Sequence, residues 1–213
     1  MTNKIMLLRQ LREAAQEING LAALKIWFRP LVCPLHVVLN EIPAGARLFD
    51  IGCGSGSFLF LAVRLRQAAV AHGYDVSACS IGFANQVARR TPNMAVRCLG
   101  ANEFPDLGGY DVITVIDVLH HIAPADQRGF LHRIYETIDP GAKLVLLDIN
   151  GDHRIRATCN LAHDLVLNRE WVHATRPAIV ASELFEAGAS VEHPILIKSL
   201  WYSHYLLTAS KPH

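Results

Sequence analysis

The sequence has few charged residues and no surplus of either sign. Charged side chains make up 18% of the 213 residues, and the formal net charge is +1 at pH 7. Because binding to a nucleic-acid backbone depends on an excess of Lys and Arg, a nucleic-acid partner is disfavoured. Hydrophobic residues, at 51%, are abundant enough for a chain of this length to bury its own core.

The cysteines follow neither a metal-binding nor a disulfide spacing. The five are Cys33, Cys53, Cys79, Cys98 and Cys159, and no two of them form a C-x-x-C pair. An odd and dispersed set argues against a zinc site and against a disulfide framework. We therefore expect small buried thiols in a reducing, cytoplasmic compartment, and no metal site.

Long apolar runs are also missing. No stretch reaches the roughly 18 residues of a membrane-spanning helix, and the N-terminus lacks the apolar core of a signal peptide. Residues 21–32 are apolar with cations among them, a composition that also suits a segment lying on a membrane surface. We expect this segment to pack on the face of the candidate active site, with peripheral membrane contact as the alternative.

Strand and helix patterns alternate along most of the chain. Strands are expected near 46–51, 75–80, 94–98, 110–116, 142–149, 189–197 and 200–209, and helices near 4–18, 21–29, 34–41, 57–71, 83–91, 126–137, 154–168 and 178–187. The first three helices form an N-terminal cap, 1–43, and the rest forms one domain, 44–213. The alternation predicts an α/β fold with a doubly wound, mostly parallel sheet. The last two strands are close in sequence and are expected to pair antiparallel.

The stretch Asp50-Ile51-Gly52-Cys53-Gly54-Ser55-Gly56 is the most informative part of the chain. It joins a strand-like apolar run to a helix-like one, which predicts a strand, a turn and a helix. Glycines at alternate positions leave no Cβ where a ligand would approach the backbone, and the helix N-terminus offers unpaired N–H groups. Asp50 is placed to orient the loop or to meet a cationic ligand. Ser57 stands where the G-x-G-x-x-G motif needs glycine, which counts against an NAD-dependent oxidoreductase.

Four blocks, in order along the chain, resemble the class I S-adenosylmethionine (SAM) dependent methyltransferases. They are residues 48–56, 110–122, 138–148 and 201–212. The resemblance covers residues 42–212 and implies a Rossmann-like sheet of seven strands with an antiparallel last strand, SAM as the cofactor, and methyl transfer as the activity. The last strand is structural in that family, so its aromatic residues are expected to lie in the core or at an interface.

The resemblance places the cofactor at the strand-end loops. The candidate cofactor-binding residues are Asp50, Gly52, Cys53, Gly54, Gly56, Ser80, Ile81, Ala101, Asn102 and Asp117. Ser80 and Ala101 stand where the family usually has acids, the first of which binds the ribose hydroxyls. A neutral hydroxyl binds more weakly than a carboxylate, so reduced cofactor affinity is expected. The alternatives are a shifted alignment, another acid nearby, or a helix cap at Ser80.

Histidines supply the candidate proton acceptors. They are His120 and His121, after the fourth strand, and His163 and His173, farther along. A histidine takes the proton of a phenol or hydroxyl acceptor at near-neutral pH. Asp148, at the end of the fifth strand, is expected to meet the substrate or a histidine. The alternative is that these histidines only pack or cap.

Together these features predict SAM-dependent methyl transfer to a small-molecule or carrier-bound acceptor. An aromatic or polyketide-like intermediate of secondary metabolism is the expected acceptor class. The alternative is a non-catalytic SAM-fold protein that serves as a binding partner or scaffold, because both usual acids are replaced. The sequence does not predict the oligomeric state.

Overall fold

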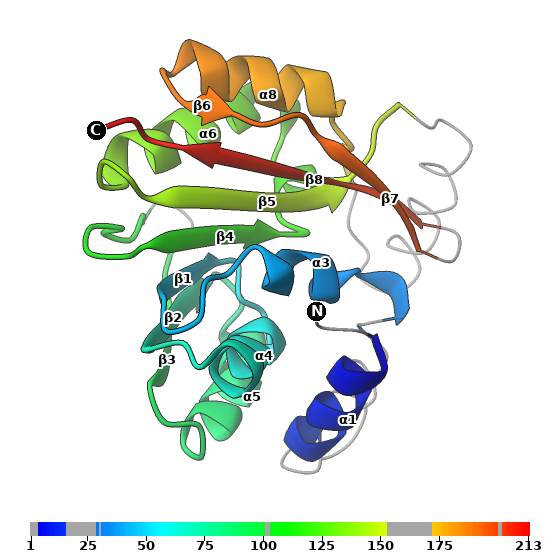
Figure 1. Cartoon of the computed structure of the whole chain (residues 1–213), viewed down its shortest axis with the longest axis vertical. Coiled ribbons are helices and arrows are strands. Elements are labelled where there is room, and N and C mark those ends of the chain that lie inside the picture. The colour runs from blue at the N-terminus through cyan, green and yellow to red at the C-terminus, as the bar shows by residue number, and fades with distance from the viewer. Residues whose placement is uncertain (1–3, 16–28, 30, 101–102, 153–171, 200–201) are drawn as a thin grey trace.

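The computed structural model describes residues 4–15, 29, 31–100, 103–152, 172–199 and 202–213. Its centre is a twisted sheet in the order β3-β2-β1-β4-β5-β8-β6, with β7 also paired to β8 (Figure 1). The strands are β1 Arg47–Ile51, β2 Val70–Asp75, β3 Met94–Cys98, β4 Val112–Ile116, β5 Lys143–Ile149, β6 Ser190–Val191, β7 Ile195–Ser199 and β8 Tyr202–Ser210. Strands β1 to β5 are parallel, whereas β8 runs antiparallel to β5, β6 and β7.

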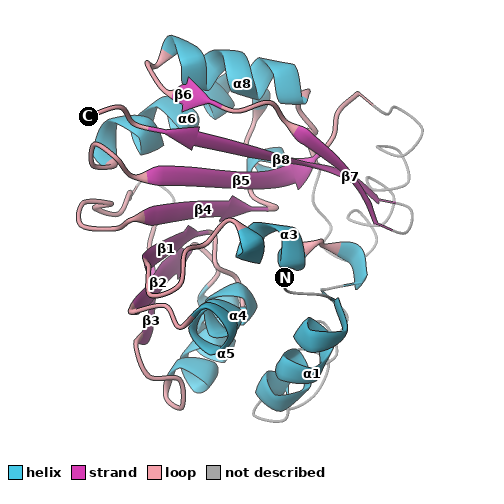
Figure 2. Cartoon of the chain, viewed as in Figure 1, coloured by secondary structure: helices cyan, strands magenta, loops and turns pink. Residues whose placement is uncertain are grey.

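Helices cover both faces of this sheet (Figure 2). They are α1 Lys4–Ala15, α3 Leu35–Asn40, α4 Ser57–Arg66, α5 Ala78–Ala88, α6 Pro124–Thr137 and α8 Pro177–Glu186, with the short 3-10 helix η1 Leu119–His121. One core lies between the sheet and α1, α3, α4 and α5, and a second lies between the sheet and α6 and α8. Strand β4 shows why the sheet is apolar on both sides: Ile116 packs into the first core and Val115 into the second.

The predicted α/β fold class is confirmed, and so are its mostly parallel sheet and antiparallel last strand. The sheet has eight strands and not seven, because the strand expected over 189–197 is divided into β6 and β7. Pro194 lies in the gap between the two pieces. Proline has no backbone N–H to give to a ladder, so it commonly interrupts a strand.

The second strand and its flanking helices were placed wrongly by the sequence pattern. The helix expected over 57–71 ends at Arg66, because its C-cap Gln67 turns into the left-handed region with φ of 53°. The strand expected over 75–80 is β2, Val70–Asp75, and the helix expected over 83–91 begins earlier, at Ala78. As a result Ser80 lies in the first turn of α5 and not at the end of a strand.

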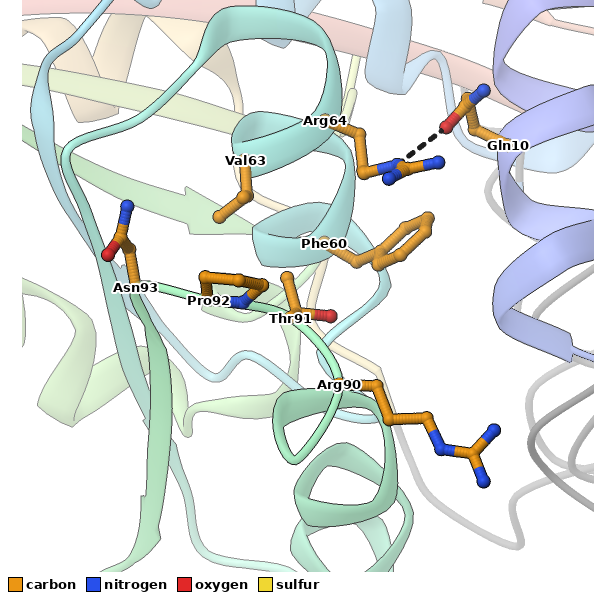
Figure 3. A pocket seen from close by; sticks show the side chains of 8 residues that line it. All are labelled: Gln10, Phe60, Val63, Arg64, Arg90, Thr91, Pro92 and Asn93. Carbon is orange, nitrogen blue, oxygen red and sulfur yellow. Dashed lines mark hydrogen bonds between the residues drawn. The ribbon is translucent and has the colours of Figure 1, made fainter.

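The N-terminal helix α1 is docked on α4. Leu7 and Leu11 are fully buried in the first core. Arg64 of α4 hydrogen-bonds Gln10 (Figure 3). It also pairs with Glu13 at 3.0 Å. The cleft drawn in Figure 3 lies between α1, α4 and the turn before β3, and no residue of the glycine loop lines it. The helices expected over 21–29 and 154–168 lie outside the described residues, apart from Arg29.

Candidate functional site

The glycine loop after β1 is built around three glycines with positive φ. An added Cβ would lie 2.4 Å from Val118 at Gly52, and 2.5 Å from Met94 at Gly56. These two glycines therefore let the loop pack closely against the protein itself, and their predicted contact with the cofactor stays a prediction. At Gly54 the nearest atom is Nη1 of Arg29, at 3.9 Å. Among the described residues, Gly54 is thus the loop glycine with the most room beside it for a ligand.

Asp75, at the carboxyl end of β2, is the acidic residue that the sequence reasoning missed. Its Oδ2 accepts a hydrogen bond of 2.8 Å from the backbone N–H of Gly54, and its Oδ1 accepts one from Ser77 N–H. The acid expected at the second strand end is therefore present. The prediction that Ser80 replaces it is wrong, because the strand ends five residues earlier than the pattern suggested. Ser80 donates its N–H to the Ser77 hydroxyl as part of the α5 cap.

Asp50 lies beneath the loop and not in it. Its carboxyl is 2% exposed and accepts a hydrogen bond of 2.6 Å from the hydroxyl of Thr114 on β4. Burial raises the pKa of Asp50 to about 7, against the lowering effects of this hydrogen bond and of Arg29. Asp50 thus ties β1 to β4, which fits the expected role in orienting the loop better than direct contact with a ligand. Burial likewise raises the pKa of the Cys53 thiol.

Asp117, directly after β4, lies between a cationic and an imidazole side chain from distant parts of the chain. Its backbone φ is 56°, a conformation that costs energy for a residue with a side chain. Oδ2 lies 3.8 Å from Arg29, and Oδ1 lies 3.5 Å from Nε2 of His204. Burial opposes ionisation, but hydrogen bonding from His204 and the charges of His204 and Arg29 hold the pKa of Asp117 well below its usual range. Asp117 is therefore a fixed negative charge beside Arg29, whose guanidinium also reaches Gly54.

The 3-10 helix η1, which follows Asp117, carries the first two candidate bases. His120 is 4% exposed, and its Nδ1 lies 2.6 Å from Oδ1 of Asp148 at the end of β5. The other carboxylate oxygen of Asp148 accepts the N–H groups of Leu119 and His120. The ring of His121 is exposed and lies against that of His120, with 4.1 Å between centroids. The expectation that Asp148 meets a histidine is confirmed.

Comparisons with known proteins agree with this geometry. A family model described as a methyltransferase domain matches residues 25–193. The chain belongs to the methyltransferase domain family. This bears out the predicted class I SAM-dependent methyltransferase, its enzyme class and its cofactor.

Individual relatives of this methyltransferase are distant. It is 30% identical over 125 residues to a ubiquinone biosynthesis O-methyltransferase of Nitrobacter winogradskyi, covering 58% of this chain and 46% of that protein. It is 25% identical over 208 residues to the protein of the same description from Acinetobacter baylyi, covering 86% and 85% of the two chains. The magnesium protoporphyrin IX methyltransferase of Synechocystis, solved with bound SAM, has the same fold with a TM-score of 0.65, 17% identity and coverage of 99% and 98%.

Gln127 of α6 fastens the methyltransferase's η1 to the segment that precedes α8. Its buried amide nitrogen lies 3.1–3.2 Å from the carbonyl oxygens of Leu119, Ile122 and His173, and its oxygen accepts the hydroxyl of Thr175. The N–H of His173 also donates to the carbonyl of His120 at 2.7 Å. The structure therefore brings the rings of His120 and His121 together and holds the backbone of His173 against η1.

The remaining predicted positions fall into two groups. His163, Ala101 and Asn102 lie outside the described residues, and Ile81 is buried in α5.

Within the described ranges, no group of three His, Cys, Asp or Glu side chains is arranged to hold a metal ion. In the same ranges, no helix is long and apolar enough to cross a membrane.

Arg29 and His204 are the other residues that sequence reasoning missed. Arg29 belongs to the segment expected to cap the active-site face, so its cationic character was the available signal. His204 was grouped with the aromatic residues of the last strand. Its neighbour Tyr205 is fully buried, which agrees with the expected core role.

Proposed function

We propose that this methyltransferase transfers a methyl group from SAM to a hydroxyl of a small aromatic acceptor. The observation that carries the proposal is the position of His121, exposed on η1 and four residues after Asp117, the acidic residue at the end of β4. A proton acceptor and a cofactor site are thus contributed by one strand end. The relatives from Nitrobacter and Acinetobacter are O-methyltransferases of ubiquinone biosynthesis, which supports oxygen as the methylated atom.

The residues of the loop fit SAM. The open backbone at Gly54 suits the methionine part of the cofactor. The carboxylate of Asp75 suits its ribose. Asp117 Oδ1 is buried, and within the described residues no donor makes a well-formed hydrogen bond to it, His204 Nε2 lying 3.5 Å away; such an oxygen suits a cationic group. Arg29 beside Gly54 suits the carboxylate, the anionic group of SAM. These four assignments are made from charge and position.

When bound, SAM supplies a methyl group already activated by its sulfonium charge, so the protein's task is to position the acceptor and take its proton. His121 accepts the hydroxyl proton while the acceptor oxygen forms its bond to the methyl carbon. With SAM bound, loss of its methyl group to that oxygen would leave S-adenosylhomocysteine (SAH) as the second product. Asp148 holds the ring of His120, and that ring supports His121 from the buried side.

Finer features of the function follow the same proposal. A phenolic ring, free or attached to a carrier, is the favoured acceptor, and a polyketide-like intermediate of secondary metabolism belongs to this class. The cap, residues 1–43, is proposed to cover the acceptor side of the 44–213 domain. The enzyme is proposed to be cytoplasmic, and the alternative is that the cap contacts a membrane surface. The scaffold alternative loses one of its two motivations, because Asp75 supplies the acid that Ser80 was thought to replace.

The experiment combines calorimetry with an activity screen. SAH binding is measured first, and methylated products are then sought by mass spectrometry from catechols, hydroquinones and carrier-bound phenols. His121→Ala should lower the rate on a phenol of high pKa by about 10²–10⁴-fold while SAH affinity stays within about twofold. His193→Ala, in the turn before β7, serves as the control. Tight SAH binding with no methylated product from any phenol would overturn the proposed acceptor class.

A further inference from the structure

We infer that His204, on the last strand, is a positioning residue of the cofactor site that fixes the carboxylate of Asp117 beside the glycine loop. The inference rests on the proposed function, since it assigns Asp117 to the cofactor. It concerns a residue 87 positions away in the sequence, on a strand with no ligand-binding motif. The argument comes from the register of the sheet, the backbone of Asp117 and the charges around it.

The register places His204 at the functional edge of the sheet. His204 pairs with Ile149, the last residue of β5, and its neighbour Tyr205 pairs with Asp148. Successive side chains of a strand point to opposite faces. Tyr205 belongs to the core beneath α6 and α8, so His204 points to the other face, where Cys33 is buried in the first core.

Two separate acid–histidine pairs therefore flank the strand ends. Asp148 with His120 lies on the α6 side and supports the candidate base. Asp117 with His204 faces Arg29 and the glycine loop. The side chain of His204 is 3% exposed, so it does not reach an acceptor in solvent. A buried imidazole next to a buried carboxylate acts on that carboxylate.

Asp117 needs such a partner because its conformation is costly. With φ of 56° it is one of three non-glycine residues in the described ranges with positive φ. Conformations of this kind persist where surrounding contacts over-determine them. The N–H of Asp117 donates to the carbonyl of Leu147 at 2.9 Å, which holds the backbone. His204 and Arg29 approach the two carboxylate oxygens from opposite ends of the chain.

The contact is long enough to leave room for a ligand. Nε2 of His204 lies 3.5 Å from Oδ1, and no closer donor within the described part of the chain satisfies that oxygen. The imidazole holds the carboxylate by charge and orientation, and the oxygen keeps a free direction for an incoming cationic group. The charged groups that act on Asp117 are His204, Arg29 and His120, and Cys33 contributes a nearby thiol.

The test compares three replacements of His204. His204→Leu removes the polar contact and should weaken SAH binding by about tenfold in calorimetry. His204→Gln places an amide N–H near the position of Nε2 and should restore affinity to within about threefold of the original. His204→Asn is too short to reach and should behave like the leucine variant. The matched control is His132→Leu, which removes another acid–histidine contact, 3.7 Å from Glu183, far from the loop.

A second measurement does not depend on the cofactor. The carboxyl carbon of Asp117, followed by NMR during acid titration, should show a higher pKa in the leucine variant, because the interactions with His204 that lower it are lost. An unchanged Asp117 titration, or equal SAH affinity in all three variants, would overturn the inference. If the original protein itself fails to bind SAH, the proposed function fails instead, and the titration still decides whether the pair exists.

Discussion

At the scale of single residues, Asp75 carries most of the evidence for a working cofactor site. It accepts the N–H of Gly54 and so connects the ends of β1 and β2. Asp75→Asn keeps an oxygen for that N–H but removes the charge, so SAH binding should weaken by about tenfold, the scale of a charge-assisted bond. Ser80→Asp should leave affinity unchanged in the same calorimetry. Tighter binding in the Ser80 variant would mean that α5 and not Asp75 meets the ribose.

Asp50 gives a second residue-scale prediction, on pH. Burial raises its folded pKa to about 7 from an ordinary value of 3.8. The folded state therefore holds a proton that the unfolded state has lost between about pH 4 and pH 7, and the free energy of unfolding should fall as pH rises through that window. The shift corresponds to an upper limit on the order of 4 kcal/mol.

Asp50→Asn tests this dependence, because the amide keeps an acceptor for Thr114 without a charge. In thermal unfolding the variant should be more stable than the original at pH 8 and similar to it at pH 4. Asp126→Asn, an exposed acid on α6, should show neither effect. Parallel stability curves for Asp50→Asn and the original protein would contradict a protonated Asp50.

The sequence predicted the residues whose role follows from local pattern. The glycine loop, Asp117 and the two histidines of η1 lie at strand ends, which hydrophobic runs locate well. Asp75 was missed because the run after α4 is alanine-rich and looks helical, whereas Val76 to Ile81 looks like a strand. His204 was missed for another reason: its partner is brought near by antiparallel pairing, which no local pattern records.

At the scale of elements, the hydrogen bonds of the Gln127 side chain join α6, η1 and the segment before α8. This set of hydrogen bonds is called the Gln127 clip. Gln127→Leu removes the donor that the structure gives to the carbonyl of Ile122 and the acceptor of the Thr175 hydroxyl, and loss of a buried hydrogen bond typically costs about 1–3 kcal/mol. Because the Gln127 clip positions His121 and His173, KM for a phenolic acceptor should rise or kcat fall by about tenfold, with SAH affinity unchanged. Steady-state kinetics and calorimetry measure the two effects separately.

The control for this clip is Gln10→Leu, on α1, where the glutamine bonds Arg64 at the protein surface. That variant should keep the acceptor kinetics of the original protein. If Gln127→Leu weakens SAH binding as much as it impairs the acceptor, the clip supports the whole loop region and does not act on the acceptor side alone.

Elements were predicted well where one pattern dominates. Strands β1, β4, β5 and β8 were placed within two residues at each end, because each is a largely buried apolar run bounded by polar or glycine-containing turns. The division of β6 from β7, and the left-handed cap at Gln67, depend on backbone geometry that residue type signals weakly. The predicted cap and domain boundary at residue 43 stays a prediction.

At the scale of the whole molecule, segments distant in the sequence meet around one carboxylate. Arg29 comes from the N-terminal segment, Gly54 from the β1–α4 loop, Asp117 from the end of β4 and His204 from the last strand. Both ends of the chain thus complete a site whose motif lies in the middle. Folding of the sheet and assembly of the site are therefore coupled events.

This convergence makes Arg29 a test of the entire arrangement. Its guanidinium lies 3.9 Å from the position of a Cβ at Gly54 and 3.8 Å from Asp117, so a ligand carboxylate at the open glycine would contact it. Arg29→Gln should weaken SAH binding by about tenfold or more, and Arg29→Lys by less, because lysine keeps the charge but not the planar fork. Arg12→Gln, exposed on α1, should have no effect. Since adenosine lacks the methionine carboxylate, its affinity should be equal in all four proteins. A parallel loss for adenosine would show that Arg29 supports the fold of the site and does not bind the ligand.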